Sequence, residues 1–224
     1  MSAVPLLFEG AGLVVVDKPA GVPVIPGRTA DGPVPLQQQL ERQLGKRVWV
    51  VHRLDRDTSG VLVFATSAAL HRAVSMAFEE GTVHKRYLAL VEGDFPEARD
   101  VDAALAPARR SRMRVAREGE EGKPAQTRLR PLQPLRGATL VEAEPLTGRT
   151  HQIRVHLQFV GHPLLVDHQY GMPGPRVLPG GATLSRTPLH AAELRLPALE
   201  GGPPRLFTSP LPPDMAEAVR ALSP

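Results

Sequence analysis

Residues 48–65 read VWVVHRLDRDTSGVLVFA and decide how the first part of the chain folds. Two apolar runs, 48–51 and 61–65, have the length and the β-branched and aromatic content of buried strands. The nine residues between them include five charged or titratable side chains, which a strand cannot easily carry through a core. The sequence therefore predicts that the chain leaves the sheet, turns near residues 58–60 and returns. A polar turn between two buried strands is a rigid mount for reactive groups, although an ordinary hairpin loop has the same pattern.

The composition limits the kinds of protein that this chain can be. Its 224 residues are 42% hydrophobic, which is enough for a sizeable core. The formal charge of +4, with 27 Lys and Arg, suits a polyanionic partner, although many basic proteins bind no nucleic acid. No apolar stretch approaches the length of a membrane span, and the N-terminus lacks the pattern of a signal peptide. We expect a soluble cytoplasmic protein that does not bind membranes.

The absence of cysteine and the spacing of the histidines argue against metal chemistry. With no cysteine, the chain has no disulfides, no thiolate metal site and no cysteine nucleophile. Among the eight histidines, His151 and His156 are five residues apart and would lie on different faces of a helix, and there is no HExxH motif. A metal-dependent hydrolase is therefore a poor fit, and we expect no metal site.

The remaining pattern predicts more strands than helices. Leu36, Leu40 and Leu44 have helical spacing and are followed by Gly45, while Ser67 is placed to cap a second helix that ends at Gly81. Further helices are expected over 150–160 and 214–222, and strands over 13–17, 82–91, 123–131, 137–144 and 189–196. Because strands do not alternate regularly with helices, we expect an α+β fold, built on a long, mostly antiparallel mixed sheet flanked by helices and loops. With no repeat and no shift in composition, residues 1–224 are expected to form a single domain.

A second informative block, LTGRTHQIRVH, covers residues 146–156. Its Thr-Gly pair predicts a turn that leads into a helix, where Arg149 and unpaired N–H groups would favour anions. Arg154 could reach inward from the first turns of that helix. An amphipathic helix with solvated Arg and His side chains is the alternative interpretation.

The densest basic cluster lies further upstream and consists of Arg109, Arg110, Arg112, Arg114 and Arg117. If this segment is a strand, Arg112 and Arg114 share one face and are candidates for phosphate contacts. Three glutamates follow at residues 118, 120 and 121, so a locally neutral hairpin is an open alternative.

Five segments together resemble the motifs of the RluA-type pseudouridine synthases. The HRLDRDTSG block resembles the family signature HRLDxxTSG, and LTGRTHQIRVH resembles a later motif, in the family's order. Residues 15–24 (VVDKPAGVPV), 85–93 (KRYLALVEG) and 161–171 (GHPLLVDHQYG) are similar to three more segments of the family. One departure is Val166, which stands where the family usually has glycine. The resemblance covers about residues 7–210, and we expect no separate S4-type RNA-binding domain of the kind that many members carry at the N-terminus.

The resemblance implies a reaction and three catalytic residues. Uridine becomes pseudouridine when its glycosidic bond to N1 breaks, the base rotates, and a bond to C5 forms, with no redox step. The family places Asp55 as the nucleophile or as the carboxylate that promotes glycosyl cleavage. Arg154 would hold that carboxylate ionised, and Tyr87 would stack on the flipped base and help to remove the C5 proton. Without the resemblance, Tyr87 would equally well be an ordinary core aromatic.

The resemblance also suggests roles for residues around these three. Arg53 is expected to enter the RNA and fill the space of the extruded nucleotide, with a surface salt bridge as the alternative. Arg149, Arg112 and Arg114 are candidates for RNA contacts. Supporting roles are expected for His52, Thr58, Ser59, Gly60, His151 and Gln152.

The expected substrate is a structured RNA, a ribosomal or transfer RNA stem-loop, bound by a monomer that needs no cofactor. A non-catalytic RNA-binding module with the same fold is one alternative. Another is a related synthase that acts on a different RNA, because RNA choice depends on loop shape and scattered contacts that motifs do not reveal.

Overall fold

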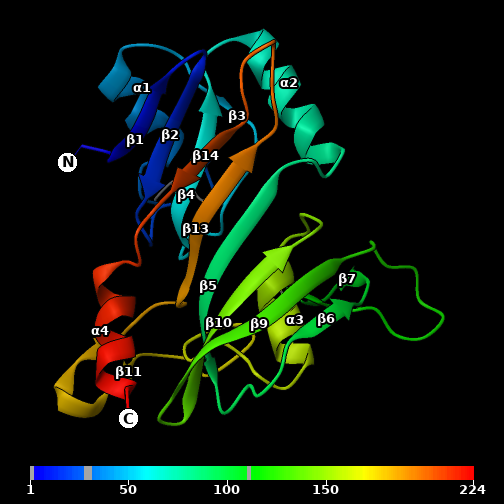
Figure 1. Ribbon diagram of the computed structural model, residues 1–224, viewed down its shortest axis with the longest axis vertical. Coiled ribbons are helices and arrows are strands. Elements are labelled where there is room, and N and C mark those ends of the chain that lie inside the picture. The colour runs from blue at the N-terminus through cyan, green and yellow to red at the C-terminus, as the bar shows by residue number, and fades with distance from the viewer. Residues whose placement is uncertain (1–2, 28–31, 110–111) are drawn as a thin grey trace. The chain divides into compact units, whose positions relative to one another are not determined.

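The computed structural model describes residues 3–27, 32–109 and 112–224. These residues form two compact units, one made of Met1–Lys85 and Ala191–Pro210, the other of Arg86–His190 and Leu211–Pro224. Helices and a predominance of strands are present in both (Figure 1), which confirms the α+β class. Every strand pair whose register is known within the described residues is antiparallel. The single domain over residues 1–224 stays a prediction.

The first unit is a sheet whose central strand follows the HRLD block. Its strands are in the order β1-β2-β4-β13, with β3 paired to β4 and β14 paired to β13. Helix α2 buries Val74 and Ala77 in a cluster with apolar side chains of the strands. The bounds are β1 Leu6–Gly10, β2 Leu13–Lys18, α1 Leu36–Leu44, β3 Trp49–Val50, β4 Ser59–Ala65, α2 Ala68–Glu79, β13 Leu189–Leu196 and β14 Arg205–Thr208.

Three helix ends are predicted in this unit, and the structure agrees with each; Gly81, with φ of 72°, directly follows Glu80, the C-cap of α2. The Ser67 hydroxyl accepts a hydrogen bond from the N–H of Leu70 at 3.2 Å, as an N-cap does. Gly45 ends α1 with φ of 64°, a left-handed conformation that favours glycine.

The turn of the HRLD block lies earlier than predicted. Trp49 and Val50 of β3 pair with Ala65 and Phe64 of β4, so the two apolar runs do form a hairpin. Its tight turn falls on residues 56 and 57, whereas Ser59 and Gly60 already belong to β4. The pairing of Gly60 with Lys18 in β2 draws these two residues into the sheet.

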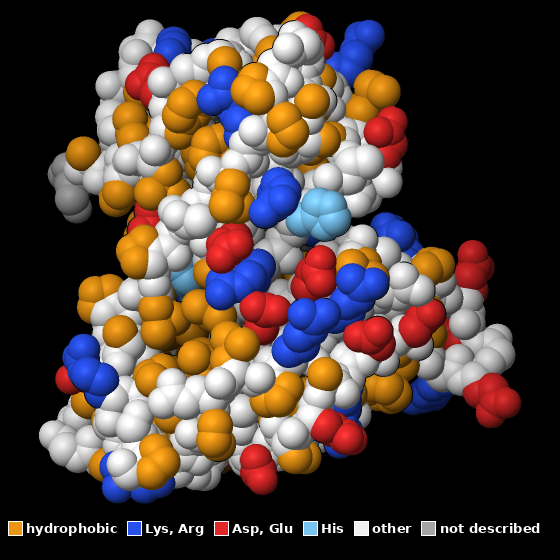
Figure 2. Space-filling model, viewed as in Figure 1, with side chains coloured by type: hydrophobic (Ala, Val, Ile, Leu, Met, Phe, Trp, Pro, Cys, Tyr) orange, Lys and Arg blue, Asp and Glu red, His pale blue; other side chains and the backbone are white. Residues whose placement is uncertain are grey.

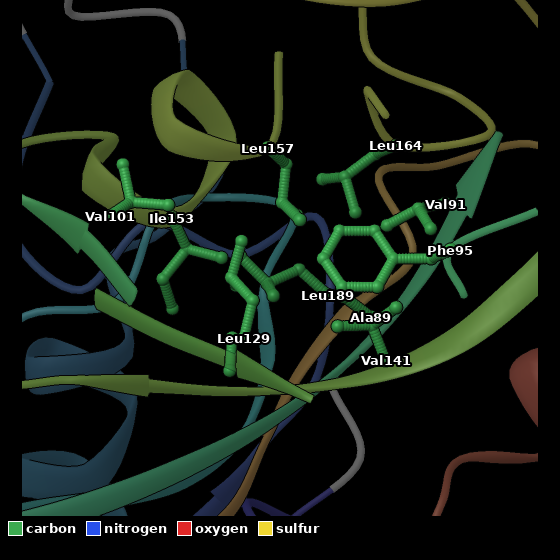
Figure 3. Close-up of a cluster of buried hydrophobic side chains, with 11 residues drawn as sticks. Ala89, Val91, Phe95, Val101, Leu129, Val141, Ile153, Leu157, Leu164 and Leu189 are labelled. Carbon is green, nitrogen blue, oxygen red and sulfur yellow. The ribbon is translucent and has the colours of Figure 1, made fainter. Parts of the chain in front are cut away.

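The second unit has a sheet in the order β5-β10-β9-β6, covered on one face by α3. Figure 3 shows Ile153 and Leu157 of α3 among the side chains of Ala89, Leu129 and Val141 from the strands. The bounds are β5 His84–Glu92, β6 Arg99–Asp102, β7 Leu105–Pro107, β8 Met113–Val115, β9 Gln126–Leu135, β10 Ala138–Pro145, α3 Gln152–Phe159, β11 Arg176–Val177, β12 Thr183–Leu184 and α4 Pro213–Leu222.

Strand β9 begins later than predicted and continues to Leu135, through two prolines. Pro131 and Pro134 pair with Val141 and Thr139 of β10. The partner on the other side, β6, pairs only with Gln126–Leu129, so both prolines lie where the outer edge of β9 bonds to no described strand. A proline is tolerated at such an edge because no ladder hydrogen bond needs its missing N–H.

Candidate active site

A backbone hydrogen bond and the buried side chain of Leu54 hold the turn over residues 55–58, called here the Asp55 turn. The N–H of Thr58 donates to the carbonyl oxygen of Asp55 at 3.2 Å and closes the turn. Leu54 is buried beside Asp55, whereas Arg53 is exposed. The Thr58 hydroxyl is buried and has no hydrogen-bond partner among the described residues, so Thr58 supports the turn through its backbone.

Lys18, at the end of β2, holds this turn through hydrogen bonds to its backbone. Its side chain is fully buried, and Nζ donates to the carbonyl oxygens of Pro19, Arg56 and Thr58 at 2.9, 2.9 and 2.8 Å. An ammonium has three N–H donors, and these three carbonyls match them in number. In return, Nε of Arg56 donates to the carbonyl oxygen of Gly21 at 3.0 Å. The two loops that follow β2 and β3 are therefore tied together at the residues just after Asp55.

His52 fixes the other end of the same turn. Its Nε2 accepts a hydrogen bond from the N–H of Val63 in β4 at 3.1 Å, and its ring stacks on Phe78 with centroids 4.5 Å apart. Burial, and secondly the nearby charge of Lys85, lower the pKa of His52 to about 3. A neutral imidazole can accept this hydrogen bond, so His52 ties the start of the turn to β4. Its supporting role in a catalytic site stays a prediction.

Gly60 is required because another strand passes close to it. A Cβ at this position would lie 2.2 Å from the carbonyl oxygen of Ala191 in β13. The φ of Gly60 is also +110°, which side chains rarely allow.

In the second unit, Arg154 is buried against an acidic partner. Its Nε and Nη2 donate to the two carboxylate oxygens of Asp167 at 2.7 and 2.8 Å, and Nη2 also donates to Oε1 of Gln169 at 3.1 Å. Its side chain reaches inward, as predicted, rather than into solvent, with the residue 8% exposed. The bidentate geometry fixes the plane of the guanidinium.

Asp167 is a carboxylate held ionised inside the protein. Burial alone would raise its pKa, but hydrogen bonds from Arg154 and from the backbone N–H groups of Gln169 and Tyr170 outweigh burial and lower the pKa of Asp167. Val166, which stands in place of the family's glycine, is itself fully buried.

Tyr87 lies on β5 opposite Ala143 of β10. Its ring is partly buried and packs against the apolar cluster beneath α3. Asp55 belongs to the first unit, and Tyr87 and Arg154 belong to the second. Their roles, and the pairing of Asp55 with Arg154, stay predictions.

The start of α3 is organised by Gln152 rather than by free N–H groups. Oε1 of Gln152 accepts from the Thr147 hydroxyl and the N–H of Arg149, and its Nε2 donates to the carbonyl oxygen of Gln126 and the Thr127 hydroxyl. The buried Gln152 therefore holds this turn onto β9, and its supporting role in a catalytic site stays a prediction. The helix begins at Gln152, two residues later than predicted, because residues 147–151 form this turn.

Arg149 lies at the surface of this turn. Its Nε donates to the carbonyl oxygen of Pro124 at 2.9 Å. Its role as an RNA contact stays a prediction.

Glu120, which follows the arginine cluster in the sequence, neutralises one of its members, Arg114. Arg114 forms a two-point ion pair with Glu120 at 2.6 and 2.7 Å, which, with the N–H of Arg117, lowers the pKa of Glu120 to about 2. Arg112 lies just before β8 and donates to the carbonyl oxygen of His168 at 3.3 Å. Arg110 lies outside the described residues. The neutral-hairpin alternative therefore holds for Arg114.

Figure 2 shows acidic and basic side chains interspersed on the face that it presents. Ion pairs of this kind include Arg86 with Glu142 and Arg128 with Glu144. Among the described residues, no group of three or more His, Asp or Glu side chains is arranged to hold a metal ion. None of the helices described is both long and apolar enough to cross a bilayer.

Lys18 is the site residue that sequence reasoning missed. Its signal was present, because Lys18 follows the apolar run Leu13–Val16 with only Asp17 between them, and a lysine that close to a buried run must find acceptors or leave the core. The resemblance included this segment but gave the lysine no role.

Comparisons with known proteins agree with the motifs. A family model described as RNA pseudouridylate synthase matches residues 12–159. The chain is 40% identical to ribosomal large subunit pseudouridine synthase D of Nitrosomonas europaea, over 98% of this chain and 66% of that protein. It is 38% identical to ribosomal large subunit pseudouridine synthase C of Pasteurella multocida, over 97% of this chain and 67% of that protein. The chain thus spans about two thirds of the length of these relatives.

The fold agrees with a solved structure as well. Human RNA pseudouridylate synthase domain containing 4 superposes with a TM-score of 0.77 at 28% identity, covering 97% of this chain and 92% of that one. With the motifs, the family model and the fold in agreement, the chain belongs to the RNA pseudouridylate synthase family.

Proposed function

We propose that this protein isomerises uridine to pseudouridine at specific positions in structured RNA. The observation that carries the proposal is the Asp55 turn, in which the buried Lys18 ammonium and the neutral His52 ring hold the backbone on both sides of one carboxylate. Such a mount suits a group that must meet the reacting carbon of a flipped nucleotide within a narrow geometry. The relatives named as ribosomal large subunit synthases favour ribosomal RNA, with transfer RNA as the second candidate.

In the proposed mechanism Asp55 is the nucleophile, or the carboxylate that promotes cleavage of the bond to N1. Tyr87 stacks on the flipped base and helps to remove the C5 proton after the base has rotated and rejoined through C5. Arg53, exposed on the Asp55 turn, fills the space that the base leaves in the RNA.

Arg154 is proposed to keep Asp55 ionised while it remains paired with Asp167. A guanidinium has five N–H donors and can serve two carboxylates at once, so the pairing with Asp167 is compatible with this role. The ion pair also changes how a variant must be interpreted. Arg154→Ala would leave the carboxylate of Asp167 buried without its cation and would destabilise the fold. The matched variant Asp167→Asn, which keeps Arg154 in the chain, separates loss of the ion pair from loss of the arginine.

We further propose a single catalytic domain over residues 1–224 that acts as a monomer in the cytoplasm without a cofactor. The reaction has no net redox change, and its proposed proton transfers need only side chains. Activity should therefore survive EDTA. Loss of activity on chelation, restored by a divalent ion while the RNA stays folded, would contradict the cofactor-free mechanism and favour the metal-dependent alternative.

The test of the function is to map pseudouridines in total RNA from cells with and without this protein. One or more sites that disappear with the protein, and return with the purified chain, would support the proposal and identify the RNA. An unchanged map would favour the non-catalytic RNA-binding alternative.

A further inference from the structure

The side chain of Tyr170 is the point where three segments of the second unit meet. Tyr170 is 4% exposed. Its hydroxyl oxygen accepts a hydrogen bond from the N–H of Met113 in β8 at 2.7 Å and lies 2.8 Å from Nδ1 of His151, the N-cap of α3. The guanidinium of Arg154 lies 4.9 Å from the centroid of the Tyr170 ring.

The contact with His151 stabilises an uncommon backbone conformation. His151 has φ of 57°, in the left-handed region, where few residues with a side chain occur. The rings of His151 and Tyr170 also meet edge to face, with centroids 5.5 Å apart. One tyrosine hydroxyl can accept from Met113 and donate to Nδ1 of His151 when that histidine carries its proton on Nε2.

The β7–β8 hairpin is attached to the segment 167–170 at several points. Met113 and Val115 pack against the buried cluster of Leu105, Ala125, Val155 and Tyr170. Arg112, beside β8, donates to the carbonyl oxygen of His168 at 3.3 Å. The same short segment binds Arg154 through Asp167 and Gln169. The arginine-rich hairpin and Arg154 are therefore held by one loop.

We propose that Tyr170 is a positioning residue that fixes the β7–β8 hairpin, the start of α3 and the Arg154 guanidinium relative to one another. RNA that contacts the hairpin through Arg112 then meets an Arg154 already in place. This inference rests on the proposed function, because it assigns Tyr170 a role in RNA binding by the same enzyme. An ordinary buried tyrosine would contribute to stability alone.

Tyr170→Phe tests the hydroxyl while keeping the ring beside Arg154. The KM for RNA should rise about fivefold, with kcat within about twofold, because the hairpin loosens while Arg154 keeps its contacts. Tyr170→Leu also removes the ring, so kcat should fall as well. Met215→Ala is the control, because it weakens a separate apolar cluster around α4 and should lower the melting temperature without changing KM. If Tyr170→Phe behaves like this control, Tyr170 is a packing residue and the proposal is wrong.

A double variant shows whether the hydroxyl acts through the hairpin. If it does, Tyr170→Phe and Arg112→Ala together should raise KM by less than the product of their separate effects, because both loosen the same attachment. Effects that multiply fully would mean that the two residues act independently and would overturn the proposal.

Hydrogen exchange separates this inference from the proposed function. In Tyr170→Phe, the Met113 amide should exchange faster while α4 keeps its protection. Unchanged exchange at Met113 would overturn the role of Tyr170 whatever the activity. Faster exchange in a protein that forms no pseudouridine would uphold the role of Tyr170 in positioning the hairpin and overturn the proposed function.

Discussion

The Lys18 ammonium donates to the carbonyl oxygen of Thr58 at 2.8 Å, and so attaches the end of β2 to the closing residue of the Asp55 turn. A lysine in this setting cannot be exchanged for an apolar residue without leaving buried carbonyls unpaired. The buried cation therefore connects the stability of the first unit to the placement of its proposed catalytic carboxylate.

Lys18→Met should lower both stability and turnover. The thioether chain has similar length but donates no hydrogen bond, so the free energy of unfolding should fall by about 3 kcal/mol or more. In the folded fraction kcat should fall about tenfold or more, because Asp55 loses its fixed position. Denaturant titration and single-turnover assays measure the two effects.

Lys46→Met is the matched control for this experiment. Lys46 pairs with Glu9 at 2.7 Å, but both side chains are more than 40% exposed. Its loss should cost less than about 1 kcal/mol. Equal losses in the free energy of unfolding for the two substitutions would show that the buried contacts of Lys18 stabilise the fold no more than an exposed ion pair does.

Gly60→Ala should be among the most destabilising single methyl additions in the first unit. The new Cβ would meet the carbonyl oxygen of Ala191 at 2.2 Å, at a φ that alanine avoids. We expect a loss of about 3 kcal/mol or more, measured by thermal or denaturant unfolding. Gly45→Ala has a left-handed φ of +64° and no atom within 4 Å of its Cβ, so it should cost only about 1 kcal/mol. Similar losses at both positions would mean that the approach of β13 to β4 is not tight.

His52 should make the protein sensitive to acid. Its pKa is about 3 when folded and near 6.5 when unfolded, so between these values only the unfolded state takes up the proton. Stability from this group is therefore complete above pH 6.5 and is lost as the pH falls toward 3, with a slope of up to about 1.4 kcal/mol per pH unit. Burial, as the main cause, also lowers the pKa of His156, which adds in the same direction.

His52→Phe keeps a ring against Phe78 and removes the titration. The free energy of unfolding should be measured from pH 7 to pH 4. Its slope against pH should be smaller than in the unmodified protein by the contribution of about one proton, which is up to about 1.4 kcal/mol per pH unit. Identical pH slopes would contradict a neutral, partly buried His52.

Arg112 and Arg114 should contribute differently to RNA binding. Arg114 is already neutralised by Glu120, whereas Arg112 donates to the carbonyl oxygen of His168, which leaves its charge in place. Arg112→Ala should flatten the slope of log K against log salt by about one unit, and Arg114→Ala by much less. Equal changes in slope would mean that RNA displaces Glu120 from Arg114, and no change in either would mean that the hairpin does not face RNA.

Local pattern predicted the elements of this fold well, because their causes are local. Helical spacing of Leu36, Leu40 and Leu44 identified α1, and alternation in residues 137–144 identified β10. The ends of elements were predicted less well where distant residues decide them. Ser59 and Gly60 look like turn residues, yet pairing with β2 places them in a strand.

The contacts of the candidate site could not be predicted from the sequence. The motifs predict Asp55, Tyr87 and Arg154 as site residues, and their roles stay predictions. The contacts of Lys18 with the Asp55 turn and of Arg154 with Asp167 depend on how separate segments fold together, which spacing alone does not reveal. The contacts of Tyr170 were equally hidden, because its hydroxyl meets Met113 and His151, which lie in two other parts of the chain.

The most direct test of the account is pseudouridine formation by Asp55→Asn on an RNA that the unmodified protein modifies. The amide keeps the shape of the carboxylate but cannot act as the nucleophile or as an ionised group. The account predicts RNA affinity and melting temperature close to those of the unmodified protein, and no product above the background without enzyme. Pseudouridine formed by Asp55→Asn above that background would contradict the assignment of Asp55 as the catalytic residue.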